Sequence, residues 1–428
     1  MKAVRSWSRL DNAAKIFPPT SSKGDSKVFR FVCELREPVD AGVLQQALEK
    51  TVKRFPFYLS VLKKGFFWYY FEETALRPVV TEESVPPCAP LYDANRPGLL
   101  FRVSCYKKRI NLEVFHALAD GMGAVNFLRT LVCFYLAEKY PDCAEEKFQL
   151  NESDPSPDQL RQDAFRKYYS KARRAGTEKE VRAYRLKGQR LPENRIGILE
   201  GLLSVEALRG CARRYHVSIT EFLTAVLLCA AGDVMSVRER ALPAVITIPV
   251  DLRRFFPTST ARNFFGLIHV GCACQTSGGS FPEVAAQVRE SFSRQLVPQK
   301  MQEIINRYSA LENNPFLRAI PLPLKIPCLR LAGHMAERGE TANISNMGRI
   351  VMPPNLSSHI RLFSVMFSTG HPQLCLCSFG DTLSVSYSSC LESTDLPRCF
   401  FRRLAGFGIK IEIRSNREQL EGDADAVL

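Results

Sequence analysis

Residues 112–131 read LEVFHALADGMGAVNFLRTL, and this stretch decides the fold of the first half of the chain. The apolar run 110–115 is typical of a β-strand, and it stops at His116. A turn through Ala-Leu-Ala-Asp-Gly follows, after which apolar residues recur at helical spacing over 123–139. Because the strand and the helix would hold His116 between them, we expect a rigid connection of the kind that carries functional side chains.

The segments around this stretch alternate between strand and helix patterns. Asp40 is placed to cap a helix that runs to Phe55, and Ser218 with Glu221 forms a capping box before another helix. Further strands are predicted at 28–35, 59–62, 66–71, 99–106, 196–203, 245–250, 341–345, 359–367, 373–378 and 383–388, further helices at 283–311 and 394–406, and irregular structure at 1–27. The sequence therefore predicts an α+β protein.

The length of 428 residues, 46% of them hydrophobic, is enough for two domains of ordinary size. The composition changes between them: Asp-Pro-Ser-Pro at 154–157 is typical of a linker, and Lys and Arg far outnumber Asp and Glu over 161–190. We therefore predict an N-terminal half at 1–150 that carries HALADG, a charged crossover linker at 151–195 and a C-terminal half at 196–428.

The formal net charge is +14, which three kinds of partner could use: nucleic acid, an anionic membrane surface, or a phosphate-bearing or acidic ligand such as CoA or a carrier protein. The sequence contains no zinc finger, no aromatic RNP-like strand and no heptad-linked basic region, so we expect no nucleic-acid partner. For any single Lys or Arg a solvated surface is the simpler explanation. Peripheral contact with a membrane is not excluded by these observations.

The 14 cysteines, together with an N-terminus that lacks an apolar signal segment, predict a reduced, cytoplasmic protein. No apolar run approaches the roughly 18 residues that a membrane span needs, so no transmembrane segment is expected. Cys272 with Cys274 and Cys375 with Cys377 form C-x-C pairs, but no partner pair with zinc-type spacing accompanies them. We expect no metal site and cysteines that mostly fill the core.

The pattern H-x-x-x-D-G, formed by His116, Asp120 and Gly121, resembles the H-H-x-x-x-D-G active-site motif of the CoA-dependent acyltransferase superfamily. That superfamily includes chloramphenicol acetyltransferase, condensation domains of peptide synthetases and many alcohol O-acyltransferases. His116 matches the second histidine of the family motif, which is the catalytic one. Phe115 replaces the first histidine, and the motif does not say what this replacement changes.

Three segments of the second half extend the resemblance in the order that the family has them. PVDLR at 249–253 resembles the segment whose arginine, here Arg253, ties the motif aspartate to the second half. ARNFFG at 261–266 and SNMG at 345–348 resemble an Asn-Phe segment and a Ser-Asn-x-Gly loop near the active-site channel. The plant signature Asp-Phe-Gly-Trp-Gly is absent. By resemblance, the chain is identified as a standalone bacterial alcohol acetyltransferase-like or polyketide-associated acyltransferase-like member.

The resemblance implies two chloramphenicol acetyltransferase-like domains, each a mixed sheet with helices, facing each other across a central channel with His116 in the middle. His116 would be the general base. Asp120 would point away from it and pair with Arg253, and Gly121 would permit the tight backbone that starts the helix. The oxyanion of the tetrahedral intermediate needs fixed donors, and the candidates along the channel are Asn263, Ser345 and Asn346.

The function implied by this resemblance is an acyltransferase that uses acyl-CoA, as a co-substrate rather than a cofactor, to acylate a small-molecule alcohol or amine. The alternative within enzymes is an acyl carrier protein as donor, for acyl transfer or condensation in natural-product or lipid biosynthesis. The alternative outside enzymes is a non-catalytic member of the fold, which the missing first histidine favours and the intact His116, Asp120, Gly121 and Arg253 oppose. We expect a monomer.

Overall fold

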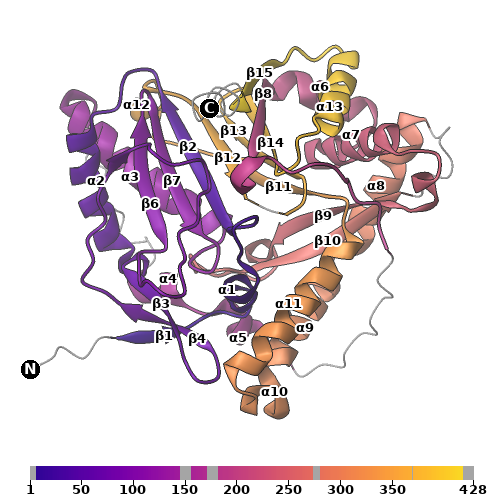
Figure 1. Ribbon diagram of the computed structural model, residues 1–428. Helices are drawn as coiled ribbons and strands as arrows, with labels where there is room; N and C mark the ends of the chain where they lie inside the picture. The colour runs from indigo at the N-terminus through magenta and orange to yellow at the C-terminus, as the bar shows by residue number, and fades with distance from the viewer. Residues whose placement is uncertain (1–5, 145–155, 171–181, 273–279, 369, 418–428) are drawn as a thin grey trace, which may run out of the picture.

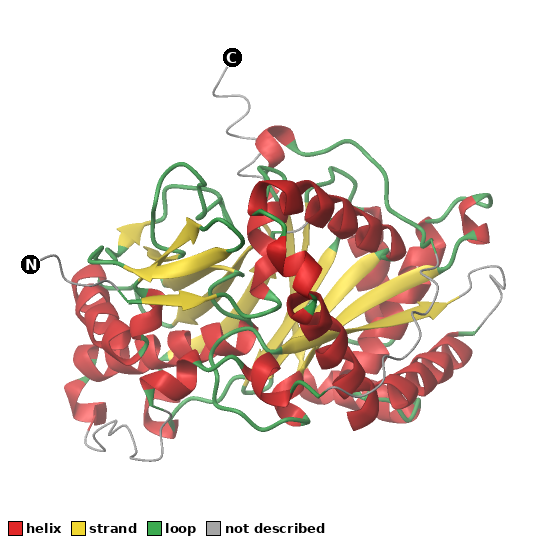
Figure 2. Ribbon diagram, turned by 90° about the horizontal axis from the view of Figure 1, so that it is seen from below, coloured by secondary structure: helices red, strands yellow, loops and turns green. Residues whose placement is uncertain are grey.

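The computed structural model describes residues 6–144, 156–170, 182–272, 280–368 and 370–417. It consists of two halves that lie side by side, each a β-sheet with helices packed against it (Figures 1 and 2). Two clusters of buried side chains, one centred on each sheet, form the cores. Helices and strands are mixed along the whole chain, so the predicted α+β class is confirmed.

The sheet of the N-terminal half has five strands in the order β12-β2-β7-β6-β5. These strands span Ile360–Phe367, Val28–Leu35, Arg109–Phe115, Phe101–Tyr106 and Thr81–Glu82. Helices α2 (Ala41–Arg54) and α3 (Gly121–Lys139) pack against each other beside this sheet (Figure 1). A small sheet combines β1 (Trp7–Arg9), β4 (Tyr69–Glu73) and β3 (Ser60–Lys64), and α1 (Phe17–Thr20) follows β1 in the chain.

The sheet of the C-terminal half has seven strands in the order β10-β9-β11-β13-β14-β8-β15. They span Phe265–Cys272, Ala244–Asp251, Ala342–Arg349, Gln373–Phe379, Thr382–Ser389, Gly197–Ser204 and Glu412–Ser415. Strand β11 is parallel to β9 and β13, and the other pairs are antiparallel. The remaining described α-helices are α4 (Pro157–Arg161), α5 (Ala164–Tyr168), α6 (Val205–Arg214), α7 (Ile219–Val234), α8 (Phe281–Gln295), α9 (Pro298–Asn313), α10 (Pro315–Ala319), α11 (Leu322–Ala336), α12 (Pro354–Ser357) and α13 (Asp395–Gly406). Of these, α4 and α12 contribute buried leucines to the N-terminal core.

Strand β12 comes late in the chain but lies in the N-terminal sheet, where it pairs antiparallel with β2. The chain then returns to the seven-stranded sheet as β13. A strand from the second half of the sequence therefore completes the N-terminal sheet, and the chain crosses between the two sheets before and after it. The boundaries at 150 and 195 stay a prediction, and residues 145–155 and 171–181 of the predicted crossover region lie outside the described residues.

Local sequence signals placed several elements correctly. Asp40 caps α2 and accepts hydrogen bonds from the backbone amides of Gly42 and Val43 at 2.8 and 3.0 Å. Ser218 and Glu221 form the predicted capping box of α7, whose apolar side chains are buried. These signals act within one turn of a helix, so they do not depend on the rest of the fold.

Two expectations are wrong, and several elements, helix α11 and strand β10 among them, have no counterpart in the sequence analysis. The segment 1–27, expected to be irregular, contains β1 and α1. The single helix expected over 283–311 is two helices, because Pro298 starts a new one. Helix α11 carries prolines in its first turn and at Pro327, and these residues obscure its helical pattern.

None of the cysteines that the structure describes forms a disulfide, and Cys375 and Cys377 are buried in β13, where burial raises the pKa of both thiols. Cys274 lies outside the described residues. Within the described ranges, no group of His, Cys, Asp or Glu side chains is arranged to hold a metal ion. No single described helix is long and apolar enough to cross a membrane; α6 and α7 meet that test only as a pair, which is bent by 77°.

Glu34 in β2 joins the two sheets at their junction. Its carboxylate accepts hydrogen bonds from Arg361 of β12 at 2.6 Å, Arg414 of β15 at 3.0 Å and Arg109 of β7 at 3.2 Å. Burial opposes the charged form, but the three guanidinium groups outweigh it and lower the pKa of Glu34. Because β15 belongs to the seven-stranded sheet, this cluster links the halves electrostatically.

The variant Glu34→Gln should lower the free energy of unfolding by about 1–3 kcal/mol at neutral pH, because it removes the shared negative charge from three arginines. The folded-state pKa of Glu34 is depressed, so its stabilisation exists above the unfolded pKa of about 4.3 and is lost as pH falls through the folded value. Denaturant unfolding at several pH values measures the difference. Glu412→Gln, which touches Arg361 and Arg414 from an exposed position, is the matched control. If the difference in unfolding free energy between the unmodified protein and Glu34→Gln does not decrease at low pH, this account is contradicted.

Candidate active site

His116 stands at the end of β7, in the turn that leads into α3, as the sequence predicts. Its backbone amide donates to the carbonyl of Lys27 at 2.9 Å, directly after the pairing of Phe115 with Val28. Asp120, four residues further along the chain, is the N-cap of helix α3, which begins at Gly121. The imidazole is therefore held between a central strand and a buried helix.

Phe115, which stands where the family motif has its first histidine, is a core residue. It is fully buried and stacks on Tyr92 with ring centroids 5.3 Å apart. Successive side chains of a strand point to opposite faces, so the side chains of Phe115 and His116 point in different directions. The aromatic ring of Phe115 therefore contributes to the N-terminal core rather than to the surroundings of the His116 imidazole.

Four aromatic rings, drawn from both halves, surround the imidazole of His116. Phe17 of α1 stacks on it with ring centroids 4.3 Å apart and an angle of 18° between the planes. Phe29 of β2, Phe265 of β10 and Phe367 of β12 lie at centroid distances of 5.2, 5.5 and 5.5 Å. Burial disfavours the imidazolium ion and lowers the pKa of His116 below its usual value, so the ring is neutral at neutral pH.

The imidazole is also one end of a chain of polar groups. Nδ1 of His116 lies 3.0 Å from Oδ1 of Asn263, and Nδ2 of Asn263 donates to Oδ2 of Asp11 at 3.2 Å. Oδ1 of Asp11 accepts from the backbone amide of Ala14 at 2.7 Å, and the Arg262 guanidinium lies 3.6 Å from Oδ2. Three segments that are far apart in the sequence therefore meet at this site.

The Asp11 carboxyl group lies in the protein interior. The side chain is fully buried, and burial raises its pKa to about 6, against the opposing effect of Arg262. Asp11 is therefore still ionised at neutral pH, as a carboxylate that can only accept hydrogen bonds.

The tautomer of His116 follows from this chain. Because the carboxylate of Asp11 only accepts, the amide nitrogen of Asn263 must face it, and the amide oxygen must face His116. An amide oxygen accepts a hydrogen bond, so the proton of the neutral imidazole lies on Nδ1. Nε2 then carries the lone pair, which is the form that a general base requires.

The Asp120 carboxylate accepts three hydrogen bonds, two of which join the two halves. Oδ1 accepts from the backbone amide of Gly123 at 2.9 Å and so caps α3. Oδ2 accepts from the backbone amide of Phe264 at 2.9 Å and from Nη1 of Arg253 at 2.8 Å. The pairing with Arg253 that the family resemblance implies is therefore present, and both side chains of the pair are largely buried.

Arg253 carries this connection into the loop that holds Asn263. Its Nε donates to the carbonyl of Thr260 at 3.1 Å, and its Nη2 donates to the carbonyl of Arg262 at 2.7 Å. Asn263 is the next residue in the chain. The ion pair thus sets the position of Asn263 against His116, although neither charged group of the pair is hydrogen bonded to the imidazole in the described structure.

Two glycines of α3 let the halves approach closely. A Cβ atom on Gly123 would lie 2.0 Å from the carbonyl oxygen of Ala261, and one on Gly121 would lie 2.5 Å from Sδ of Met347. Gly121 is not among the described residues with a left-handed backbone. Its expected role at the start of the helix stays a prediction, and the missing side chain leaves room for the end of the Met347 side chain of β11.

The remaining oxyanion candidates lie on β11. The contact between Met347 and Gly121 brings this strand next to the motif, as the sequence predicts. Ser345 is half-buried, and Nδ2 of Asn346 donates to Oγ1 of Thr220 at 2.8 Å. The amide of Asn346 is thus engaged within the C-terminal half, and the oxyanion roles of both residues stay predictions.

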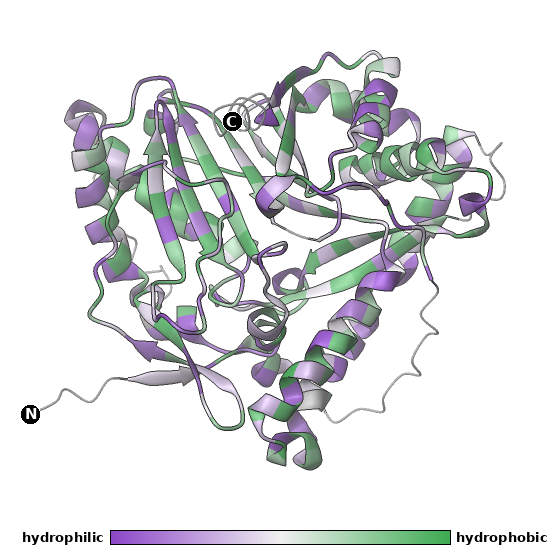
Figure 3. Cartoon of the chain, viewed as in Figure 1, coloured by the Kyte–Doolittle hydropathy of each residue, from purple (hydrophilic) through white to green (hydrophobic). Residues whose placement is uncertain are grey.

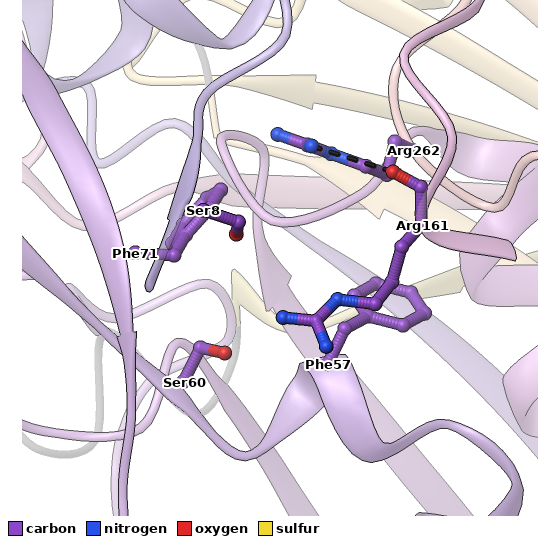
Figure 4. Close-up of a pocket in the computed structure, with 6 residues that line it drawn as sticks. All are labelled: Ser8, Phe57, Ser60, Phe71, Arg161 and Arg262. Carbon is purple, nitrogen blue, oxygen red and sulfur yellow. Dashed lines mark hydrogen bonds between the residues drawn. The ribbon is translucent and has the colours of Figure 1, made fainter. Parts of the chain in front are cut away.

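Two pockets near the junction of the halves differ from the histidine site. The first has a volume of about 10 Å³, room for a single water molecule, and Figure 4 shows its lining of Ser8, Phe57, Ser60, Phe71, Arg161 and Arg262. The second is an open cleft of about 500 Å³ between β12 and β8 with β14, and its charged lining residues are Arg361, Asp381, Lys410 and Glu412. Because both signs of charge line this cleft, it does not select an anionic ligand.

Sequence reasoning missed several residues that shape the site. Asp11 and Phe17 lie in a segment that was expected to be irregular, and Phe29 and Phe367 are ordinary apolar positions of predicted strands. A single Asp and single Phe residues form no pattern that points to a distant histidine. The one signal available was the ARNFFG segment, which identified Asn263 but suggested an oxyanion role for it.

No family model matches this sequence, and no curated protein matches it. Solved structures match almost the whole chain. Polyketide synthase associated protein 5 from Mycobacterium tuberculosis matches with a TM-score of 0.62 at 14% identity, over 92% of this chain and 96% of that one. TRI101 of F. graminearum, complexed with Coenzyme A and T-2 mycotoxin, gives 0.63 at 13% identity over 92% and 97%. The first condensation domain of the CDA synthetase gives 0.59 at 15% identity over 95% and 97%.

The chain shares its fold with these solved structures. The fold that the HALADG motif and the three segments of the second half predict is therefore confirmed. At these levels of identity the likeness concerns the fold, and the chemistry has to be argued from the residues of the site.

The variant Asp120→Asn should lower the free energy of unfolding by about 3–5 kcal/mol, because it leaves a buried guanidinium without its main counter-charge. Asp251→Asn is the matched control, since Asp251 touches the same Nη1 of Arg253 at 2.9 Å from a more exposed position. We expect the control to lose less than half as much, as measured by thermal and denaturant unfolding. A stable Asp120→Asn protein that has lost turnover would instead assign Asp120 a direct part in the chemistry.

Proposed function

We propose that this protein is an acyltransferase that moves an acyl group from a thioester, acyl-CoA first of all, to an alcohol or amine, with Nε2 of His116 as general base. One observation carries the proposal: Asn263 holds Nδ1 of His116 at 3.0 Å inside an aromatic site, so that Nε2 keeps its lone pair. The fold supports it, because TRI101, which shares this fold, was crystallised with Coenzyme A and T-2 mycotoxin.

The proposed reaction moves one proton twice. Nε2 of His116 takes the proton of the acceptor while the acceptor oxygen or nitrogen attacks the thioester carbonyl carbon. The tetrahedral intermediate then collapses, the C–S bond breaks, and the imidazolium returns the proton to the leaving thiolate. A serine or cysteine nucleophile is not required, because both substrates would occupy the site together.

The surroundings of His116 suit this task. The lowered pKa keeps the imidazole neutral between turnovers, and the aromatic rings around this half-buried side chain would limit the access of water that hydrolyses the thioester. The amide of Asn263 contacts His116 through its oxygen and Asp11 through its nitrogen. We therefore assign Asn263 to the positioning of the imidazole and keep Ser345 and Asn346 as the proposed oxyanion donors.

An acyl carrier protein is the second candidate donor. The condensation domain of the CDA synthetase shares the fold, and the net charge of +14 suits an acidic protein as well as the phosphates of CoA. A non-catalytic member of the fold is the third candidate, against which the ordered chain from Asp11 to His116 argues. We further propose that no cofactor is bound and that the protein acts as a monomer in the cytoplasm, where reduced thiols persist.

The variant His116→Ala should stay folded and lower turnover by about 10²–10⁴-fold, because it removes the base and leaves the surrounding elements in place. Mass spectrometry of products formed from acetyl-CoA and longer acyl-CoAs with a panel of alcohols and amines measures this loss and identifies donor and acceptor together. His216→Asn is the control, an exposed histidine whose backbone φ of 56° asparagine tolerates. Full activity in His116→Ala would contradict the proposal; product from carrier-loaded acyl groups alone would replace acyl-CoA as the donor.

Two substitutions of Asn263 should move the pH profile in opposite directions. The base must be neutral, so kcat/KM falls as pH drops through the pKa of His116. Asn263→Ala removes a hydrogen bond that favours the imidazolium, so it should shift this acid limb to lower pH and reduce kcat by about 10–100-fold. Asn263→Asp places a carboxylate beside the ring and against that of Asp11; the two buried acids then share one proton, and the remaining negative charge should shift the limb to higher pH. Loss of activity in both variants with no shift in either would show a purely structural role for Asn263.

A further inference from the structure

Helix α11 presents an apolar stripe to the solvent. Leu324, Cys328, Leu331 and Met335 follow one another at spacings of three and four residues and so share one face of the helix. The exposed fractions of the three large side chains are 65% for Leu324, 61% for Leu331 and 50% for Met335. The helix is anchored outside this stripe, where Leu322 and Lys325 are buried. An exposed apolar face of this kind marks an interaction surface.

Two neighbouring segments extend this apolar face. The tip of the β3–β4 hairpin exposes Phe66 and Phe67, and it is fastened to α11 because the amide of Leu322 donates to the carbonyl of Phe66 at 2.8 Å. The ammonium group of Lys325 donates to the carbonyl of Phe67 at 3.1 Å. Phe316 of α10 is 83% exposed. In Figures 1 and 3 the hydrophobic hairpin tip lies beside the ends of α10 and α11.

We define the docking surface by its six exposed apolar residues, Phe66, Phe67, Phe316, Leu324, Leu331 and Met335. Its two component segments contain no acidic residue: neither 59–71 nor 315–336 has an Asp or Glu, while Lys63, Lys64, Arg318 and Arg330 fall within them beside the buried Lys325. The surface is therefore apolar and basic at once, and the nearest acidic residues in the sequence are Glu72 and Glu337, just beyond the ends of the two segments.

We propose that this docking surface binds the surface of an anionic lipid membrane. Exposed aromatic and aliphatic side chains would enter the boundary between headgroups and acyl chains, and the Lys and Arg side chains would reach the lipid phosphates. Six of the exposed large apolar side chains gather on the hairpin tip, on α10 and on one face of α11, in stretches without negative charge, whereas others, such as Trp7 and Val237, lie elsewhere on the molecule. The net charge of +14 adds long-range attraction to the same partner.

A second copy of the chain fits this surface less well. Most dimers are two-fold symmetric, so the same patch would meet itself. Arg318, Arg330 and Lys64 would then face their own counterparts, with no carboxylate in either segment to neutralise them. A membrane rich in anionic lipid offers the complementary charge instead.

The surface is connected to the histidine site through α1. Nε of Arg330 donates to the carbonyl of Pro19 at 2.8 Å, and Gly333 lies against Thr20. Phe17, in the same short helix, stacks on His116. Membrane binding does not rest on the proposed acyl transfer, but a bound bilayer would lie on the side of the molecule from which α1 reaches the imidazole.

Vesicle flotation of the full chain tests the proposal without any substrate. We expect binding to phosphatidylcholine vesicles that contain phosphatidylglycerol, and weaker binding as salt concentration rises. Leu331→Glu and Phe316→Glu should each lower the partition coefficient at least about tenfold, because each replaces an apolar side chain that the membrane would bury. Val237→Glu is the matched control: Val237 is 84% exposed in a turn outside the docking surface, and its substitution should leave binding unchanged.

Melting temperatures equal to that of the unmodified protein establish that the variants fold. Equal binding to vesicles of phosphatidylcholine alone, or no binding to either kind, would overturn the proposal. A concentration-dependent dimer that disappears in Leu331→Glu would assign the surface to a second copy and overturn it as well. Because no acyl donor is present, failure here leaves the proposed acyl transfer untouched.

Discussion

The buried ion pair between Asp120 and Arg253 is the interaction on which the rest of the site depends. It connects the N-cap of α3 to the loop 260–264, and it does so across the boundary between the two sheets. Glycines at the start of α3 allow the backbones to come close enough for this contact. Taking two charges out of water is unfavourable unless both are fully hydrogen bonded, and here the carboxylate and the guanidinium each have several partners. The consequence is a fixed distance between Asn263 and His116.

A strand carried from one half into the sheet of the other reinforces this arrangement. β12 lies beside β2 and supplies Phe367 to the aromatic surroundings of His116, while β10 supplies Phe265 and α1 supplies Phe17. The imidazole is thus enclosed by elements from the beginning, middle and end of the chain. Its neutral state and its tautomer are properties of the complete molecule, since neither half alone provides both the apolar rings and the chain of hydrogen bonds.

The sequence was informative wherever a signal is local. The caps at Asp40 and Ser218, the strand that ends at His116 and the α+β class all follow from patterns within about ten residues. The family motif added one long-range fact, the pairing of Asp120 with Arg253. Contacts between residues far apart in the sequence could not be predicted. Asp11 belongs to no sequence pattern, and its role follows only from its hydrogen bond with Asn263, which lies 252 positions away. Prolines were poor guides to helix boundaries. Pro298 starts a new helix within a continuous apolar pattern, whereas Pro327 lies inside α11 without ending it.

The central claim is that His116 is neutral with its proton on Nδ1, held by Asn263, so that Nε2 is free to accept a proton. Nitrogen NMR of protein with isotope-labelled histidine tests this directly, and with only 6 histidines in the chain a His116→Gln spectrum assigns the signal. The account predicts a protonated Nδ1, an unprotonated Nε2 and a titration below the usual histidine pKa of about 6.5. A proton on Nε2, or a charged ring at neutral pH, would contradict it.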